Sequence, residues 1–308
     1  MHLAEGTIPL VQALGWSAAA IPALAWSIRG EQRARSDSSS ASVVMAGATS
    51  LLFAVTLLPL PIPVLGATSH LCLTPLLALV VGVRRIIWPT FFVLLLQALF
   101  FAHGGLTTLG VNTLTLGLLG PLIAVGVWGA LQRLGAGNVY GLAAACLAGD
   151  LGVYLADALV LAAALSDAVR PSTTFAGVLV GFAPVQGPLA LVEAVASVGI
   201  VRVLAGRRPD LLPASLRGLR TPTSTGASLL LVLLVTTLAG CGYEGIDGTV
   251  FGAVAESAGR PPTDSIVDFS QGEFGLAMTI IVLFGLGFVA GSSWQRLVTE
   301  ERTASPDG

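Results

Sequence analysis

The sequence contains no lysine, and only 10% of its 308 residues are charged. A soluble globular domain carries roughly a quarter charged residues, so this composition excludes an ordinary soluble domain. With 54% hydrophobic residues and a mean hydropathy of +0.86, the chain is predicted to be an all-α, polytopic membrane protein. The net charge of −2 gives no reason to expect nucleic acid as a partner, and the expected partner is membrane lipid.

Motifs for catalysis and redox chemistry are also missing. The three cysteines show no C-x-x-C spacing and are expected to be small core residues. The sequence has neither a G-x-x-x-x-G-K-[ST] loop nor an H-E-x-x-H helix. The chain is therefore predicted not to be an enzyme, and any ATP hydrolysis must come from other subunits. Because no basic segment precedes the first apolar run, a signal peptide is not expected, and Met1 and His2 should remain at the start.

Apolar runs of about 20 residues are long enough to cross a bilayer as helices. Such runs lie near residues 8–28, 41–60, 111–132, 139–165, 174–204, 226–242 and 274–294. Two shorter runs, 71–83 and 87–102, are separated by Arg84, Arg85 and Pro89, which predicts a tight helical hairpin. The sequence thus predicts nine crossings.

The arginines predict the orientation, because cytoplasmic loops are rich in positive charge. With the N-terminus outside, thirteen arginines fall on the inner side, and only Arg170 and Arg260 fall on the outer side. The prediction is a multi-pass protein of the cell (inner) membrane. Its outer loops are acidic. Either this acidic surface attracts cations, or it is only the counterpart of the positively charged inner side.

The three histidines of the chain, His2, His70 and His103, all lie at the outer face in this topology. A chain that begins Met1-His2 offers its amine, the His2 amide nitrogen and a His2 ring nitrogen as donors in one plane. One further imidazole, from His70, would complete a square. Four nitrogens in a plane suit Ni(II) or Cu(II) better than Zn(II), Mg(II) or Ca(II). The alternative is that Met1-His2 is only the start of the gene and that His70 caps a turn.

The run from Gln97 to Asn112 places a polar side chain in an apolar helix and then breaks the helix with glycines around His103. Irregular backbone at membrane depth must be covered by protein or must line a cavity. This break is therefore expected to dip inward and line the site. Gln97 and Asn112 either orient the metal-binding imidazoles or form hydrogen bonds between helices.

Three stretches carry a resemblance to a known family: Met1-His2 with Glu5-Gly6, the turn ending Ser69-His70, and the run from Gln97 to Asn112. Together they resemble the CbiM/NikM family, the substrate-binding M component of nickel and cobalt energy-coupling-factor (ECF) transporters. The resemblance implies a seven-helix core that binds Ni(II) or Co(II) as its transported ligand. It also implies a transmembrane coupling subunit and ATPase subunits as partners. The implied metal ligands are Met1, His2 and His70, with His103 matching the histidine of the glycine-rich loop.

The predicted domains are a metal-binding core over residues 1–205, a cytoplasmic linker over 206–225 and a two-helix module over 226–308, similar to the small N component. Three acids, Asp150, Asp157 and Glu193, lie within apolar runs, where acids are costly and usually functional. They are expected to form structural hydrogen bonds. The alternative is that they carry protons, in which case the chain would be a passive or proton-coupled metal carrier that works without ATPase partners.

Overall fold

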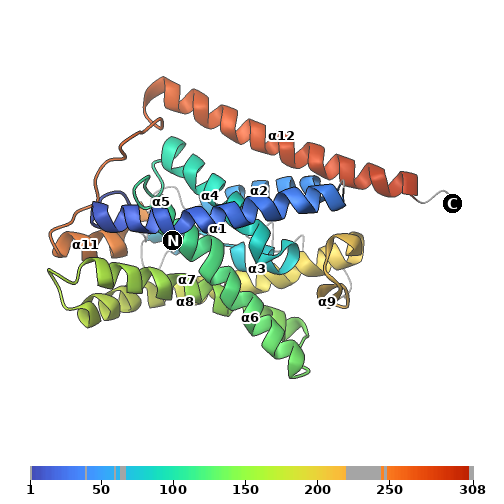
Figure 1. Ribbon diagram of the computed structural model, residues 1–308, viewed down its shortest axis with the longest axis horizontal. Coiled ribbons are helices and arrows are strands. Elements are labelled where there is room, and N and C mark those ends of the chain that lie inside the picture. Colours follow the sequence, from blue (N-terminus) through green and yellow to red (C-terminus); the bar gives the residue numbers. More distant parts are fainter. Residues whose placement is uncertain are drawn as a thin grey trace.

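The computed structural model describes residues 2–38, 40–58, 60–62, 67–219, 244–245 and 248–304 (Figure 1). Helices make up most of this part of the chain. The long ones are α1 (Leu10–Asp37), α2 (Ser40–Leu57), α4 (Val83–Phe100), α6 (Gly120–Arg133), α7 (Val139–Ala164), α8 (Pro171–Arg207) and α12 (Gly272–Ala304). The short ones are α3 (Thr74–Val81), α5 (Leu109–Leu114), α9 (Ala214–Arg217) and α11 (Ala253–Ser257). A π-helical turn, Thr115–Leu119, joins α5 to α6, so Leu109–Arg133 forms one membrane-length segment.

Seven helices among the described residues are long and apolar enough to span a membrane: Leu10–Asp37, Ser40–Leu57, Val83–Phe100, Leu109–Arg133, Val139–Ala164, Pro171–Arg207 and Gly272–Ser293. The predicted all-helical, multi-pass membrane fold is therefore confirmed. Of the other two predicted crossings, 226–242 lies outside the described residues. The run 71–83 forms only the eight-residue helix α3. At 1.5 Å per residue, α3 is about 12 Å long, well short of a hydrocarbon core of about 30 Å.

Helices α7 and α8 lie side by side along much of their length, and α12 runs along the opposite side of the bundle beside α2 (Figure 1). Only 6% of the apolar window of α12 is buried within the chain. Apolar side chains such as Phe284 and Phe288 are 79% and 75% exposed. Such a surface suits contact with lipid, whose chains are as apolar as the side chains themselves.

Two short strands lie between α2 and α3 in the sequence, and they form a small sheet with a third strand from much later in the chain. Strand β1 (Leu60–Ile62) pairs antiparallel with β2 (Ala67–Ser69), and β2 pairs in parallel with β3 (Glu244–Gly245). Pro61 lies in the edge strand β1, where a missing N–H donor is tolerated. The sequence predicted only a turn here. His70 follows β2 directly, so the sheet places this histidine.

The first part of the predicted linker packs against the core. After α8, a 3-10 turn (Pro209–Leu211) and α9 bring Leu212, Leu216 and Leu219 into a buried cluster. The remainder of the predicted linker, from residue 220, lies outside the described residues.

Candidate metal centre

The N-terminal segment is buried before α1 begins. His2 is 2% exposed and Leu3 is fully buried. The Leu3 N–H donates to Asn112 Oδ1 (3.0 Å), and Asn112 Nδ2 donates to the Leu3 carbonyl (3.1 Å). The Thr108 hydroxyl donates to the same carbonyl (2.6 Å). Asn112 and Thr108 therefore fix the backbone beside His2. The predicted ligand Met1 lies outside the described residues.

The glycine-rich break lies against this N-terminal segment, as the sequence predicted. The Glu5 carboxylate, only 3% exposed, accepts hydrogen bonds from the backbone of Leu106 (2.7 Å) and from the backbone and hydroxyl of Thr107. A Cβ at Gly105 would lie 2.7 Å from the Glu5 nitrogen, and Gly104 has φ +83° close to His2. Only glycine permits this approach and this φ. The break therefore brings His103 to the N-terminus.

Three imidazoles converge from three separate segments. The ring centroids lie 5.1 Å apart for His2 and His70, 4.5 Å apart for His2 and His103, and 5.2 Å apart for His70 and His103. One ring nitrogen from each lies within 4.8 Å of the others. The three histidines therefore lie close together, and their position at the outer face of the membrane stays a prediction. His103, which the sequence placed in a supporting role, is as near as the other two.

The ring nitrogens have contacts that suit a cation. Both ring nitrogens of His2 are buried and have no hydrogen-bond partner within the described part of the chain. His70 Nδ1 lies 3.1 Å from the Leu71 carbonyl, which can only accept, so in the neutral ring Nε2 carries the lone pair. That Nε2 lies 3.3 Å from His103 Nε2. Two nitrogens bound to one ion at about 2.0 Å each lie roughly 2.9 to 3.3 Å apart, depending on the geometry.

The environment keeps His2 neutral. Burial lowers the pKa of the His2 imidazole well below its usual 6.5, and the neighbouring rings of His103 and His70 lower it further. A neutral imidazole has a lone pair available for a metal, whereas an imidazolium has none. The site therefore favours the metal-binding protonation state at neutral pH.

Gln97 and Ser69 serve other contacts. Gln97 Nε2 donates to the Thr56 hydroxyl of α2 (2.7 Å), which is the hydrogen bond between helices that the sequence left as an alternative. Its backbone carbonyl accepts from the His103 N–H (3.2 Å). The Ser69 hydroxyl accepts from Gln186 Nε2 of α8 (2.6 Å). Sequence reasoning missed Gln186, whose only signal is a polar residue in an apolar run.

The three acids of the apolar runs are all buried. Asp150 is 1% exposed, Asp157 is fully buried and Glu193 is 1% exposed. Glu193 accepts hydrogen bonds from the Cys72 and Leu73 N–H groups. The structural role expected from the sequence thus fits Glu193.

The fold and the site together define a multi-pass helical membrane protein with a buried imidazole cluster beside its N-terminus. The chain belongs to the CbiM family, because the family model described as "Cobalt uptake substrate-specific transmembrane region" matches residues 2–211. It is similar to the cobalt transport protein CbiM of Geobacter sulfurreducens, at 33% identity over 98% of this chain and 91% of that protein. A second relative of the same description, from Sorangium cellulosum, is 37% identical over 69% of this chain and 94% of that protein.

Two solved structures share the fold. One, described as a transition metal transporter, superposes with a TM-score of 0.57 at 21% identity, covering 71% of this chain and 97% of that one. The other, described as a truncated transition metal transporter, gives a TM-score of 0.56 at 23% identity, covering 66% of this chain and 97% of that one. The family model and the relatives show that the chain is a membrane component for metal uptake.

Proposed function

We propose that this chain is the metal-capture component of an ECF importer for Co(II) or Ni(II). The observation that carries the proposal is the cluster of His2, His70 and His103, whose donor atoms lie within 4.8 Å of one another. Neutral imidazoles suit late first-row divalent ions better than Mg(II) or Ca(II). The names of the relatives support cobalt, and the nitrogen ligands are equally compatible with nickel.

In the proposed coordination, the ion binds the Met1 amine, the amide and ring nitrogens of His2 and a ring nitrogen of His70. Two observations support this assignment: the ring nitrogens of His2 have no partner among the described residues, and the Leu71 carbonyl sets the tautomer of His70. His103 Nε2 lies 3.3 Å from His70 Nε2, the nitrogen that would bind the ion, and His103 is therefore the replacement candidate for the fourth ligand.

We further propose that the predicted module over 226–308, of which the structure describes residues 244–245 and 248–304, belongs to the capture unit as an N-component-like module fused to the core. Contacts with the N-terminal segment support this role. The Thr263 N–H donates to the Glu5 carbonyl (3.0 Å), and the Arg260 guanidinium donates to the carbonyls of Gly6 (3.4 Å) and Ile8 (3.2 Å). These bonds hold the residues that follow His2.

The same module also reaches the His70 and His103 segments. Strand β3 pairs with β2, which ends one residue before His70. The Phe269 N–H donates to the Leu99 carbonyl (2.8 Å) at the end of α4, and the rings of Phe269 and Phe100 stack. The module therefore contacts all three segments that carry the histidines.

Energy for uptake is proposed to come from a coupling subunit and ATPase subunits, because the chain has no phosphate-binding loop of its own. The N-terminus and the histidines face outward in this proposal, as the arginines predict for nine crossings. The pairing of Arg85 with Glu31, near the end of α1 away from His2, supports an inner position for Arg85. A proton-coupled carrier is the second candidate, favoured by the buried carboxylates Asp150 and Asp157 in the membrane-spanning α7.

Uptake of Co(II) and Ni(II) into proteoliposomes separates the two functions. For an ECF component we expect stoichiometric binding by the chain alone and accumulation only when partner subunits and ATP are supplied. Accumulation by the chain alone, driven by a proton gradient, would support the carrier. A chain that binds neither ion would contradict both.

A further inference from the structure

Helix α8 carries two buried residues with long polar side chains, Gln186 and Glu193, in a largely apolar membrane segment. They are 2% and 1% exposed. Because they are seven residues apart, close to two helical turns, their side chains leave α8 on the same face. Both bind the loop that contains His70. Gln186 binds the residue before it, and Glu193 binds the second and third residues after it.

The bond pattern of Glu193 is bidentate. One carboxylate oxygen accepts from the Cys72 N–H at 2.6 Å, and the other accepts from the Leu73 N–H at 2.8 Å. These two groups lie at the start of α3, where the N-cap Leu73 has φ +55° and the first turn contains no acid. A carboxylate is stabilised at a helix N-terminus by the partial positive charge of the free N–H groups. Glu193 thus supplies from α8 the cap that α3 lacks.

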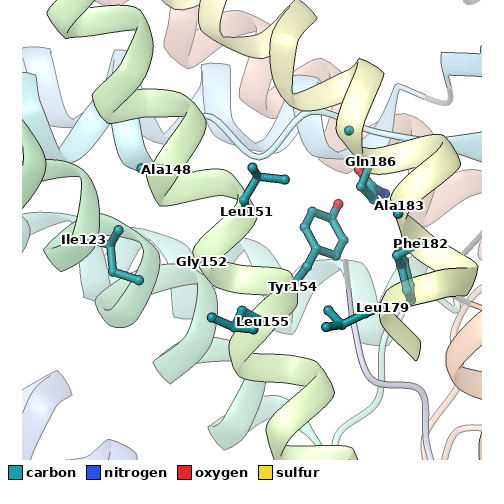
Figure 2. Close-up of a pocket in the computed structure, with 11 residues that line it drawn as sticks. Ile123, Ala148, Leu151, Gly152, Tyr154, Leu155, Leu179, Phe182, Ala183 and Gln186 are labelled. Carbon is teal, nitrogen blue, oxygen red and sulfur yellow. The ribbon is translucent and has the colours of Figure 1, made fainter. Parts of the chain in front are cut away.

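Gln186 holds the other side of the loop. Its amide Nε2 donates to the Ser69 hydroxyl at 2.6 Å, and Ser69 ends β2 next to His70. Gln186 also lines an apolar cavity of 530 Å³ between α7 and α8, together with Tyr154 and Phe182 (Figure 2). A hydrogen bond in apolar surroundings is stronger than one in water, and breaking it leaves its partner unsatisfied.

We propose that Gln186 and Glu193 form an α8 clamp, a pair of positioning residues that hold His70 in place for the metal from both sides. The clamp fixes the backbone from Ser69 to Leu73, and the Leu71 carbonyl in that stretch sets the tautomer of His70. The affinity for the ion therefore depends on the position of α8 relative to this loop. The inference rests on the proposed function, in which His70 is a ligand.

The test is a Ni(II) titration of the purified full-length chain with its native N-terminus, followed by calorimetry and by the visible absorption of the bound ion. Glu193→Gln keeps the size of the side chain but turns an amide NH₂ toward one backbone N–H. Its Kd should rise about 10- to 100-fold, the usual range for residues that orient a metal ligand. The visible band should shift, because His70 is no longer held. Glu193→Asp keeps the charge and should recover part of the affinity.

Gln186→Leu and Ser69→Ala remove the second contact and should each weaken binding, and the double variant should be no weaker than the worse single one. The control is Thr174→Val, a buried and isosteric change on α8 at a hydroxyl with no hydrogen-bond partner in the described chain. It should bind as the unaltered protein does.

The outcomes separate the clamp from the proposed function. If the unaltered chain does not bind Ni(II), both fail. If it binds, but folded Glu193→Gln and Gln186→Leu retain its affinity and spectrum, the clamp alone is overturned. Should Glu193→Gln not fold, Gln186→Leu and Ser69→Ala decide in the same way. A loss of thermal stability without a change in spectrum or affinity would also overturn the clamp, because it would show a purely structural role.

Discussion

Buried polar groups have different partners at two ends of the bundle: the histidine end, around His2, His70 and His103, and the far end, around Glu31 near the C-terminus of α1. At the far end, the Glu31 carboxylate, 5% exposed, is paired with Arg35 (3.0 Å) and Arg85 (2.8 Å). At the histidine end, Asn112 instead binds the backbone of Leu3, and the ring nitrogens of His2 have no partner among the described residues. Ion pairs between side chains hold helices together. Buried ring nitrogens without a hydrogen-bond partner destabilise the fold, and a ligand that binds them can remove this penalty. The contrast separates a structural end from a binding end.

The largest effect should come from removing a donor at the histidine end. His2→Ala and His70→Ala each delete a proposed ligand, so the affinity for Ni(II) and Co(II) should fall by more than the roughly 10- to 100-fold typical of supporting residues. Calorimetric titration measures this loss. Thermal unfolding of the metal-free variants serves as the control and should change little. Normal binding by His70→Ala would make His103 the fourth ligand.

The next largest effect should come from pH. In the folded chain the pKa of His2 lies below 6.5, so below pH 6.5 the unfolded chain takes up a proton that the folded chain does not. The free energy of unfolding should therefore fall as the pH falls below 6.5, by at most about 1.4 kcal/mol per pH unit for this group. Denaturant unfolding of the metal-free chain at pH 7.5 and 5.5 tests the sign. In His2→Ala this part of the pH dependence should disappear, and its persistence would contradict the assignment to His2.

Asn112→Ala should have an intermediate effect on the free energy of unfolding and on metal affinity. It leaves the buried N–H of Leu3 without its side-chain acceptor, at a cost of about 1 to 3 kcal/mol in the free energy of unfolding. It also releases His2 and should weaken metal binding. The matched control is Thr113→Val on the same helix, which loses only a bond to the Leu109 carbonyl of its own helix. Equal metal affinities for the two variants would argue against a positioning role for Asn112.

The smallest effect on metal binding is expected at the opposite end. Glu31→Gln breaks the pairs with Arg35 and Arg85 and should lower stability by about 1 to 3 kcal/mol, because Arg85 is only 19% exposed. The affinity for Ni(II) should not change, since Glu31 lies 21 residues, or about 32 Å, along α1 from its first residue, Leu10. A drop in affinity comparable to that of Asn112→Ala would remove the distinction between the two ends.

Much of the fold could be predicted from apolar runs, because a membrane span needs about 20 apolar residues and few sequences meet this by chance. Helices α7 and α8 start and end close to the predicted 139–165 and 174–204. The strands could not be predicted, because β1 and β2 have three residues each and the first contains Pro61. Helix α3 is shorter than its apolar run, because Cys72 and Leu73 stay in the loop that Glu193 holds.

The proximity of the three histidines could be predicted in part, because the topology predicted from the arginines puts His2, His70 and His103 on one side of the membrane. The groups that position the cluster could not. Glu193 and Gln186 lie about 120 residues from the loop they bind, and neither periodicity nor spacing links such distant positions. A buried polar residue in an apolar run indicates that some partner exists without identifying it.

The central claim, a planar nitrogen chelate that begins at the chain's own amine, is tested most directly by titrating Ni(II) into the chain with its native Met1 and into the same chain carrying an uncleaved N-terminal extension. With the native start, we predict tight binding that releases protons, with an affinity that falls as the pH is lowered from about 8 to 6. The bound Ni(II) should be diamagnetic and yellow-orange, as square-planar nitrogen coordination requires. The extended chain should lose most of this affinity. An extended chain that binds as tightly as the native one would contradict the account. So would a pale octahedral spectrum with the affinity retained to about pH 5, as expected of carboxylate ligands.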